Sequence, residues 1–214
     1  MNRALFFDNV RKMPFPGTIS QSQVAGCLAI LDEAEKRKTE FRYLAYMLAT
    51  AYHETAHTMQ PIAEYGRGKG RAYAEVINGR VYYGRGYVQL TWIKNYETMG
   101  KLLKIDLVGN PELALNPGVA AQIMFEGMVR GSFTGKRLTD FFNDTKTDWV
   151  NARKIINGLD RAEMIASYAR QFHGALIAAN ATASIPLPPD IPKPPPKSEP
   201  GFWSKFGALF KPKV

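Results

Sequence analysis

The run Tyr43-Leu44-Ala45-Tyr46-Met47-Leu48-Ala49-Thr50-Ala51-Tyr52 leads directly into His53-Glu54-Thr55-Ala56-His57. Its nearly continuous apolar character predicts a buried helix from Phe41 to about Met59, which Pro61 should end. Polar, glycine-rich and aromatic residues follow in one segment that extends to Tyr96. We therefore expect the fold to be built on this helix and the functional residues to follow it.

Two carboxylates flank the turn after this helix. Glu54 lies near the helix end, and partial burial of a carboxyl group favours the protonated form that a general acid needs. Glu64 follows Pro61 at the start of a glycine-rich loop, where we expect it to be more solvated and ionised. Two carboxylates in contrasting environments are what glycosidic hydrolysis requires. The alternative is that each carboxylate only pairs with a nearby arginine.

The segment His53–His57 also fits the pattern H-E-x-x-H, in which two histidines on one helix face bind zinc and the glutamate acts as a base. The extended form of this pattern needs glycine and histidine where the chain has Gln60 and Ala63. The one further histidine is His173. A zinc peptidase or amidase therefore remains an alternative.

A second motif closes the segment: Tyr82-Tyr83-Gly84-Arg85-Gly86-Tyr87-Val88-Gln89-Leu90-Thr91-Trp92. Its Gly-x-Gly lets the backbone approach a ligand closely, although the same pattern occurs in phosphate-binding loops. Amide and hydroxyl groups beside flat aromatic rings suit a sugar chain, which has hydroxyl edges and C–H faces. The alternative is that the rings belong to the core, which we favour for Tyr87 and Trp92, and that the amides cap helices.

The rest of the chain predicts a mainly α fold. Residues 1–20 are expected to be turn-rich, and residues 73–78 and 80–83 are expected to form a small hairpin around Asn78-Gly79. Asn116-Pro117 is placed to begin a helix. Helical spacing and turn signals predict further helices over residues 24–38, 90–103, 119–129, 136–142, 149–156 and 161–179.

Composition limits the function classes. The net charge of +9 favours anionic partners such as nucleic acid, acidic membranes or cell-wall polymers. The basic residues are scattered, however, and without a basic stripe or a reader helix we predict no nucleic-acid binding. Cys27 is the single cysteine, so an intramolecular disulfide and a cysteine zinc cluster are excluded. The N-terminus shows no signal peptide and no segment has the length of a membrane span.

One folded domain, a linker and a tail are expected along the chain. Residues 1–183 form the catalytic domain, and residues 184–200 form a stiff, proline-rich linker. Residues 201–214 form a basic amphipathic tail, in which Phe202 to Lys211 could contact the outer membrane or another anionic lipid surface. The alternative is that this tail is an inert extension.

Several motifs of the chain, in their order, resemble those of family 19 glycoside hydrolases, which are chitinases and related bacteriophage endolysins. The likeness extends from about Tyr43 to His173. The spacing between Glu54 and Glu64 is similar to that of the phage branch. The segments that carry the resemblance are His53-Glu54-Thr55, Tyr82 to Thr91, Asn95-Tyr96, Asn110 to Ala114, Asn116-Pro117 and Ala152 to Gly158.

The resemblance implies a lysozyme-like, two-lobed helical fold with a catalytic cleft, and hydrolysis with inversion that needs no metal and no other cofactor. On this chain Glu54 matches the general acid, Glu64 is the candidate base that activates water, and Thr91 matches a residue that helps to hold this water. A late arginine of the plant members falls at Met164, with Arg161 or Arg170 as a substitute. The sugar-contacting positions are His53, Gln89, Asn95 and Asn157, to which we add the ring of Tyr83.

The resemblance does not separate chitin from peptidoglycan, because both contain β-1,4-linked N-acetylated sugars. The positive charge and the lack of a secretion signal and of disulfides favour peptidoglycan. We therefore expect a monomeric endolysin that is made in the host cytoplasm, is released to the periplasm and cuts the cell wall for host lysis. A chitinase is the first alternative, and a catalytically silent sugar-binding module is another.

Overall fold

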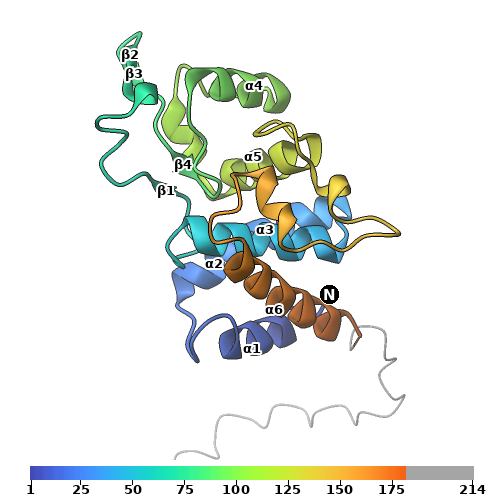
Figure 1. The fold of residues 1–214 in the computed structure, drawn as a ribbon. Helices are drawn as coiled ribbons and strands as arrows, with labels where there is room; N and C mark the ends of the chain where they lie inside the picture. Colours follow the sequence, from blue (N-terminus) through green and yellow to red (C-terminus); the bar gives the residue numbers. More distant parts are fainter. Residues whose placement is uncertain (182–214) are drawn as a thin grey trace, which may run out of the picture. The chain divides into compact units, whose positions relative to one another are not determined.

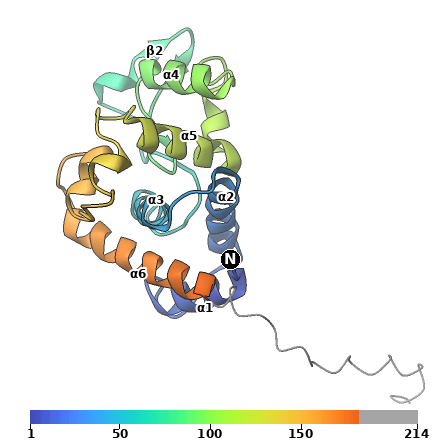
Figure 2. The ribbon, with the colours of Figure 1, turned by 90° about the vertical axis from the view of Figure 1, so that its right-hand side faces the viewer.

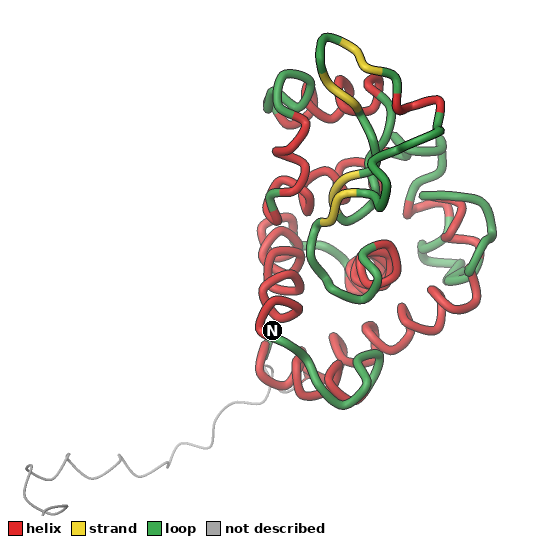
Figure 3. Tube along the Cα trace, turned by 90° about the vertical axis from the view of Figure 1, so that its left-hand side faces the viewer, coloured by secondary structure: helices red, strands yellow, loops and turns green. Residues whose placement is uncertain are grey.

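The computed structural model of this chain describes residues 1–181. The predicted linker 184–200 and tail 201–214 lie outside the described residues. Helix α3 (Phe41–Glu54) occupies the centre of the described part, where Figures 2 and 3 show it end-on and surrounded by other elements. It packs mainly against α6 (Ala162–Ala181), which also packs against α1 (Arg3–Lys12). Helix α2 (Gln21–Arg37) packs against α5 (Pro117–Arg130) and completes the surroundings of α3.

Local sequence explains how these helices begin and end. Ser20 accepts a hydrogen bond from the Gln23 backbone, and the Gln23 side chain accepts one from the Ser20 backbone, which forms a capping box at the start of α2. Helix α5 begins at Pro117, as predicted, with Asn116 as its N-cap, and Gly131 with φ +73° is its C-cap. Among the described helices, none is long and apolar enough to cross a membrane.

Two small antiparallel sheets accompany the helices (Figure 1). Strand β2 (Val76–Ile77) pairs with β3 (Arg80–Val81) around Asn78 and Gly79, which both have positive φ. This hairpin was predicted, although its strands are shorter than expected. Strand β1 (Ile62–Ala63) pairs with β4 (Arg85–Gly86), a pairing that the sequence did not predict. The mainly α fold with a small β-hairpin is confirmed.

Other boundaries differ from the predictions. Residues 1–20 are not only turns, because Phe6 and Val10 bury one face of α1. Helix α4 (Ile93–Leu103) begins three residues later than expected. The short helices predicted over 136–142 and 149–156 are the 3₁₀ turns η3 (Leu138–Asp140) and η4 (Asn151–Ile155). Two further 3₁₀ turns are η1 (Ala72–Ala74) and η2 (Pro111–Leu115).

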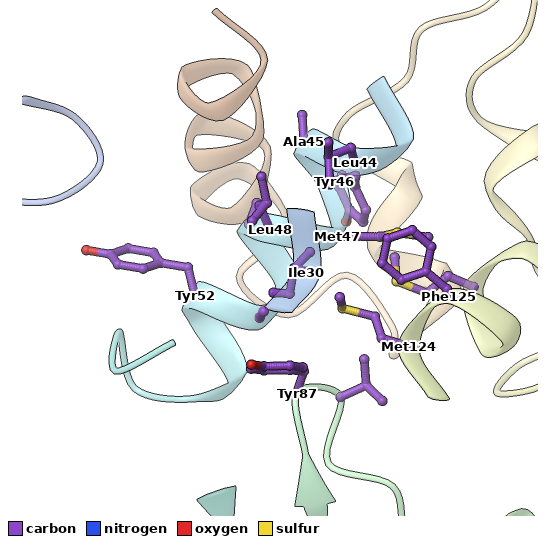
Figure 4. Close-up of a cluster of buried hydrophobic side chains, with 14 of the residues drawn as sticks. Ile30, Leu44, Ala45, Tyr46, Met47, Leu48, Tyr52, Tyr87, Met124 and Phe125 are labelled. Atoms are coloured by element: carbon purple, nitrogen blue, oxygen red, sulfur yellow. The ribbon is translucent and has the colours of Figure 1, made fainter. Parts of the chain in front are cut away.

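The core joins α3 to the motif that follows it. Figure 4 shows Met47 and Leu48 of α3 close to Ile30 of α2 and Met124 of α5. The ring of Tyr87 closes this cluster from the side of β4, and its hydroxyl donates a hydrogen bond to the Gly26 carbonyl at 3.3 Å. Tyr87 is therefore a core residue, as predicted. Its burial fixes the second motif against the helices that surround α3.

Candidate active site

Helix α3 ends at Glu54, five residues before the predicted end at Met59. Thr55 is the C-cap, and Ala56 and His57 both have positive φ. The His57 backbone N–H bonds to the Tyr52 carbonyl at 2.8 Å, and the His57 ring stacks on the Tyr52 ring with centroids 4.2 Å apart. The helix is therefore ended by this turn and not by Pro61. Glu54 lies at the last helical position.

The early helix end overturns the basis of the zinc alternative. The H-E-x-x-H pattern presents its two histidines on one face of a continuous helix. Here His53 is helical and His57 lies beyond the helix, packed on Tyr52 and Tyr168. Within residues 1–181, no three histidine, cysteine, aspartate or glutamate side chains are grouped to bind a metal ion. The donor set does not fit a zinc site in this part of the chain.

Arg153 contacts the Glu54 side chain. Its Nη1 lies 2.6 Å from Glu54 Oε1, and its Nε donates to the Asp160 carbonyl at 3.2 Å. Arg153 is only 3% exposed, whereas the Glu54 side chain is 18% exposed. The arginine that reaches Glu54 is therefore Arg153 of η4. Arg161 and Arg170, which the sequence offered in place of a late arginine of the plant members, are exposed residues.

His53, beside Glu54, is half-buried. Burial lowers the pKa of its imidazole, the neighbouring Glu54 opposes this shift, and Arg153 adds to it. The neutral imidazole has one donor and one acceptor nitrogen, which suits a hydroxyl or an acetamido group. This environment is compatible with the predicted sugar-contacting role.

Glu64 is held by two hydrogen bonds. The Tyr73 hydroxyl donates to Oε1 at 2.6 Å, and the Gly84 backbone N–H donates to Oε2 at 3.1 Å. The bond to Glu64 is the main reason why the pKa of Tyr73 is raised, because it stabilises the protonated hydroxyl beside a carboxylate. Glu64 is half-buried, so it is less solvated than the sequence suggested. Unlike Glu54, it forms no ion pair within the described residues.

The pairing of β1 with β4 brings Glu64 to the second motif. Ile62 pairs with Gly86, and the Glu64 backbone N–H bonds to the Gly84 carbonyl at 2.7 Å. A Cβ on Gly84 would lie 2.9 Å from Gln89 Oε1 and 3.3 Å from Glu64 Cβ. The first glycine of Gly-x-Gly thus leaves room for the side chains of Gln89 and Glu64, whereas the sequence suggested room for a ligand.

Residues 88–92 of the second motif line a cavity of about 180 Å³. The Gln89 amide donates to the carbonyls of Ile62 and Gly86, both at 3.1 Å, so its nitrogen is used within the fold. Asn95 donates to the Thr91 carbonyl at 2.8 Å. The structure brings three predicted site residues to one cavity. Its wall includes Gln89, Thr91, Trp92, Asn95, Phe133 and Ile156.

Trp92 is not a core residue, contrary to the prediction. Its side chain is 48% exposed and its backbone has φ +68°, an uncommon conformation for a bulky residue. The ring contacts that of Tyr73 edge-on, with centroids 5.7 Å apart. The indole is thus exposed at the edge of the cavity and beside the tyrosine that holds Glu64.

Two other predicted residues have mainly structural contacts. Tyr83 is buried, and the Arg85 guanidinium lies over its ring at 3.5 Å from the centroid. Asn157 is exposed, its Oδ1 accepts from the Gly158 N–H at 2.8 Å, and its own N–H bonds to the Arg153 carbonyl. Asn157 is connected to Glu54 through Arg153. Arg153 lies in the segment Ala152 to Gly158 that carries the resemblance, but the sequence assigned it no role, because its partner is distant in the chain.

The comparisons with known proteins agree with these observations. Residues 29–129 match the family model described as chitinase class I, a segment that includes both carboxylates but not Arg153. The basic endochitinase CHB4 of Brassica napus is 39% identical over 87 residues, which cover 37% of this chain and 32% of that protein. The chain therefore matches only about a third of the length of that curated relative.

Solved structures share the fold. Chitinase C from Streptomyces griseus HUT6037 matches with a TM-score of 0.57 and 21% identity, over 81% of this chain and 75% of that chain. The family 19, class IV chitinase from Zea mays matches with a TM-score of 0.53 and 20% identity, over 80% of this chain and 90% of that chain. Over residues 29–129 the chain is therefore similar to the chitinase class I family, and its described part shares the fold of family 19 chitinases.

Proposed function

We propose that this protein is a glycoside hydrolase that cuts β-1,4 bonds between N-acetylated amino sugars of peptidoglycan by an inverting mechanism. The observation that carries the proposal is the contrast between the two carboxylates. Glu54 ends a buried helix beside Arg153, whereas Glu64 is held by the neutral donors Tyr73 and Gly84. The two carboxyl groups therefore lie in different environments, as an acid and a base require. The assignment of the acid role to Glu54 and of the base role to Glu64 comes from the sequence motifs.

In this mechanism Glu54 donates a proton to the glycosidic oxygen as it leaves. Glu64 takes a proton from a water molecule that attacks the opposite face of the sugar ring. The hydrogen bonds from Tyr73 and Gly84 hold the Glu64 carboxylate in one orientation, which supports its assignment as this base. Thr91 helps to hold the water, and His53, Gln89 and Asn95 contact the sugar. The cavity lined by Gln89, Thr91 and Asn95 binds acetamido and hydroxyl groups of the sugar.

Peptidoglycan is proposed over chitin because of the charge of the protein. The net charge of +9 favours an anionic polymer over neutral chitin. The biological role that fits is that of a bacteriophage endolysin, made in the host cytoplasm and acting in the periplasm at lysis. Chitin hydrolysis is the second candidate, because the matching relatives are endochitinases.

The test is digestion of purified Gram-negative sacculi, and of chitin in parallel, by wild-type protein and by the Glu54→Gln variant. New reducing ends and new amino groups are counted, and mass spectrometry identifies the sugar at each cut. The proposal predicts reducing ends from sacculi that disappear with Glu54→Gln. Cleavage of chitin alone would establish the second candidate. New amino groups without reducing ends would contradict both.

A further inference from the structure

A second groove, of about 530 Å³, lies beside the β2–β3 hairpin and is separate from the cavity of Gln89, Thr91 and Asn95. Figure 1 shows this hairpin projecting from the helical part of the fold, near α4. The groove is lined by the hairpin, by the loop that follows Glu64 and by the start of η2. The lining residues that matter here are Arg67, Arg80, Tyr83, Arg85, Asn110 and Glu112.

The charges of this groove do not cancel. Arg85 is buried and pairs with Glu112, with Nη2 at 2.7 Å and Nε at 3.0 Å from Glu112 Oε1, so these two charges compensate each other. Arg67 and Arg80 are exposed, and neither forms an ion pair with any residue from 1 to 181. Arg80 donates one hydrogen bond to the Asn78 carbonyl at 3.2 Å, which leaves its other donors available. The groove therefore presents two uncompensated guanidinium groups.

The groove is connected to the candidate base by short stretches of chain. The Arg67 N–H bonds to the Glu64 carbonyl at 3.0 Å, so Arg67 lies one turn beyond Glu64. On the other side, Tyr83 lines the groove, and the next residue, Gly84, donates to the Glu64 carboxylate at 3.1 Å. A polymer that is cleaved at Glu64 has further sugar units on either side of the cleaved bond. Because the groove lies next to the residues that hold Glu64, it is placed to bind such units.

We propose that this groove binds carboxylate groups carried by the peptide substituents of a peptidoglycan strand. Guanidinium groups match the planar carboxylate with paired N–H donors, and the neutral rings of chitin offer no such group. This inference rests on the proposed function and deepens it: Glu54 and Glu64 carry out the cleavage, and Arg67 and Arg80 select an anionic strand over a neutral one.

The test compares the full-length wild type with Arg67→Gln/Arg80→Gln. The control is Lys12→Gln/Lys101→Gln, which removes the same charge from exposed residues on α1 and α4 that form no ion pair in the described part of the chain. Three substrates are used: soluble peptidoglycan strands, the same strands with their carboxyl groups converted to amides, and N-acetylglucosamine oligomers. Reducing ends give kcat and KM.

We expect the arginine double variant to raise KM for the native strands about three- to tenfold, since exposed ion pairs are individually weak. The wild type should lose the same factor when the strands are amidated, and added salt should reduce the difference. KM for the amidated strands and the neutral oligomers should stay within about twofold of wild type. An unchanged KM for native strands, or an equal rise on all three substrates or in the lysine control, would overturn the proposal.

The outcome also separates this inference from the proposed function. If the wild type releases no reducing ends from any substrate, the proposed function is wrong. The groove is then judged by the Kd of the wild type and of the arginine double variant for native and amidated strands, measured by fluorescence anisotropy. Tighter binding of native strands that depends on Arg67 and Arg80 supports the groove, and equal Kd values overturn it.

Discussion

Arg153 Nη1 lies 2.6 Å from Glu54 Oε1, across 99 residues of sequence. The guanidinium is buried, and its Nε is fixed on the Asp160 carbonyl. Glu54 is thus oriented by a residue from a different element, η4. Because a general acid must hold its proton toward the leaving oxygen, this contact should influence catalysis as well as folding.

The first prediction concerns catalysis. Arg153→Gln should lower kcat about tenfold or more, which corresponds to an increase of about 1.4 kcal/mol in the activation free energy. KM should change less, because Arg153 orients Glu54 and does not bind the substrate. Arg153→Lys should give an intermediate kcat, because the ammonium keeps the charge but not the planar fork. The control is the exposed neighbour in Lys154→Gln. An unchanged kcat in Arg153→Gln would show that this contact is only structural.

The second prediction concerns stability. Glu54→Gln leaves the buried guanidinium without its carboxylate and should lower the free energy of unfolding by up to about 3 kcal/mol, the low end for a buried pair because Glu54 is partly exposed. Glu54→Gln/Arg153→Met should cost less than the sum of the two single variants, with a coupling of about 1–3 kcal/mol in urea unfolding. Additive effects would mean that the two side chains do not interact.

The third prediction tests how Glu64 is held. Tyr73→Phe removes the hydroxyl that lies 2.6 Å from Glu64 Oε1. Because a hydrogen bond to a charged group is worth about 1.5–3 kcal/mol, kcat should fall about 10- to 100-fold. Tyr65→Phe is the matched control, since Tyr65 is the exposed neighbour of Glu64. Equal kcat values for the two variants would exclude a role of Tyr73 in orienting Glu64.

Much of the fold could be predicted because its signals are local. The capping box of Ser20 and Gln23 and the Asn116-Pro117 start of α5 depend only on neighbouring residues. The end of α3 was placed too late, because the prediction relied on Pro61. The chain leaves the helix earlier, in a turn that is stabilised by the packing of His57 on Tyr52.

The candidate site was predicted only in part, since its geometry depends on distant contacts. Glu54, Glu64, Gln89, Thr91 and Asn95 could be identified from motifs. The pairing of β1 with β4 involves two residues from each strand, too few to show an alternating pattern. Likewise, no local pattern distinguishes a buried arginine that serves a distant carboxylate from an exposed one. Arg153 therefore became visible only in the folded chain.

The fourth prediction follows from two histidines. Burial lowers the pKa of His53 and also that of His173, where Arg42 adds to the shift and Glu40 opposes it. In the unfolded chain a histidine has a pKa of about 6.5. As the pH falls below this value, the unfolded chain takes up protons that the folded chain does not, so the free energy of unfolding decreases.

The free energy of unfolding should therefore be higher at pH 7 than at pH 5. His173→Gln should reduce the difference between these two pH values by up to about 1 kcal/mol, because it removes one of the two protonation events. His53→Gln/His173→Gln should reduce it further. Urea unfolding at several pH values between 5 and 7 measures this difference. The carboxylates with lowered pKa, such as Glu126 and Asp148, take up protons below this range and therefore do not obscure the effect of the histidines. An identical difference in all variants would contradict the prediction.

The last prediction concerns the turn between the two carboxylates, which rests on α2. A Cβ on Gly26 would lie 1.6 Å from the Met59 carbonyl oxygen. Gly26→Ala should therefore destabilise the protein by about 1–3 kcal/mol or more, although alanine is the better helix former. Gly174→Ala in α6 is the matched control, because no atom lies within 4 Å of its added Cβ. It should stabilise the protein by about 0.5–1 kcal/mol.

Thermal and urea unfolding give the change in stability of both variants. A shift of the same sign in the two variants would show that the Gly26–Met59 contact does not constrain the turn. Because this turn connects Glu54 to β1, Gly26→Ala should also lower kcat, whereas Gly174→Ala should leave it unchanged.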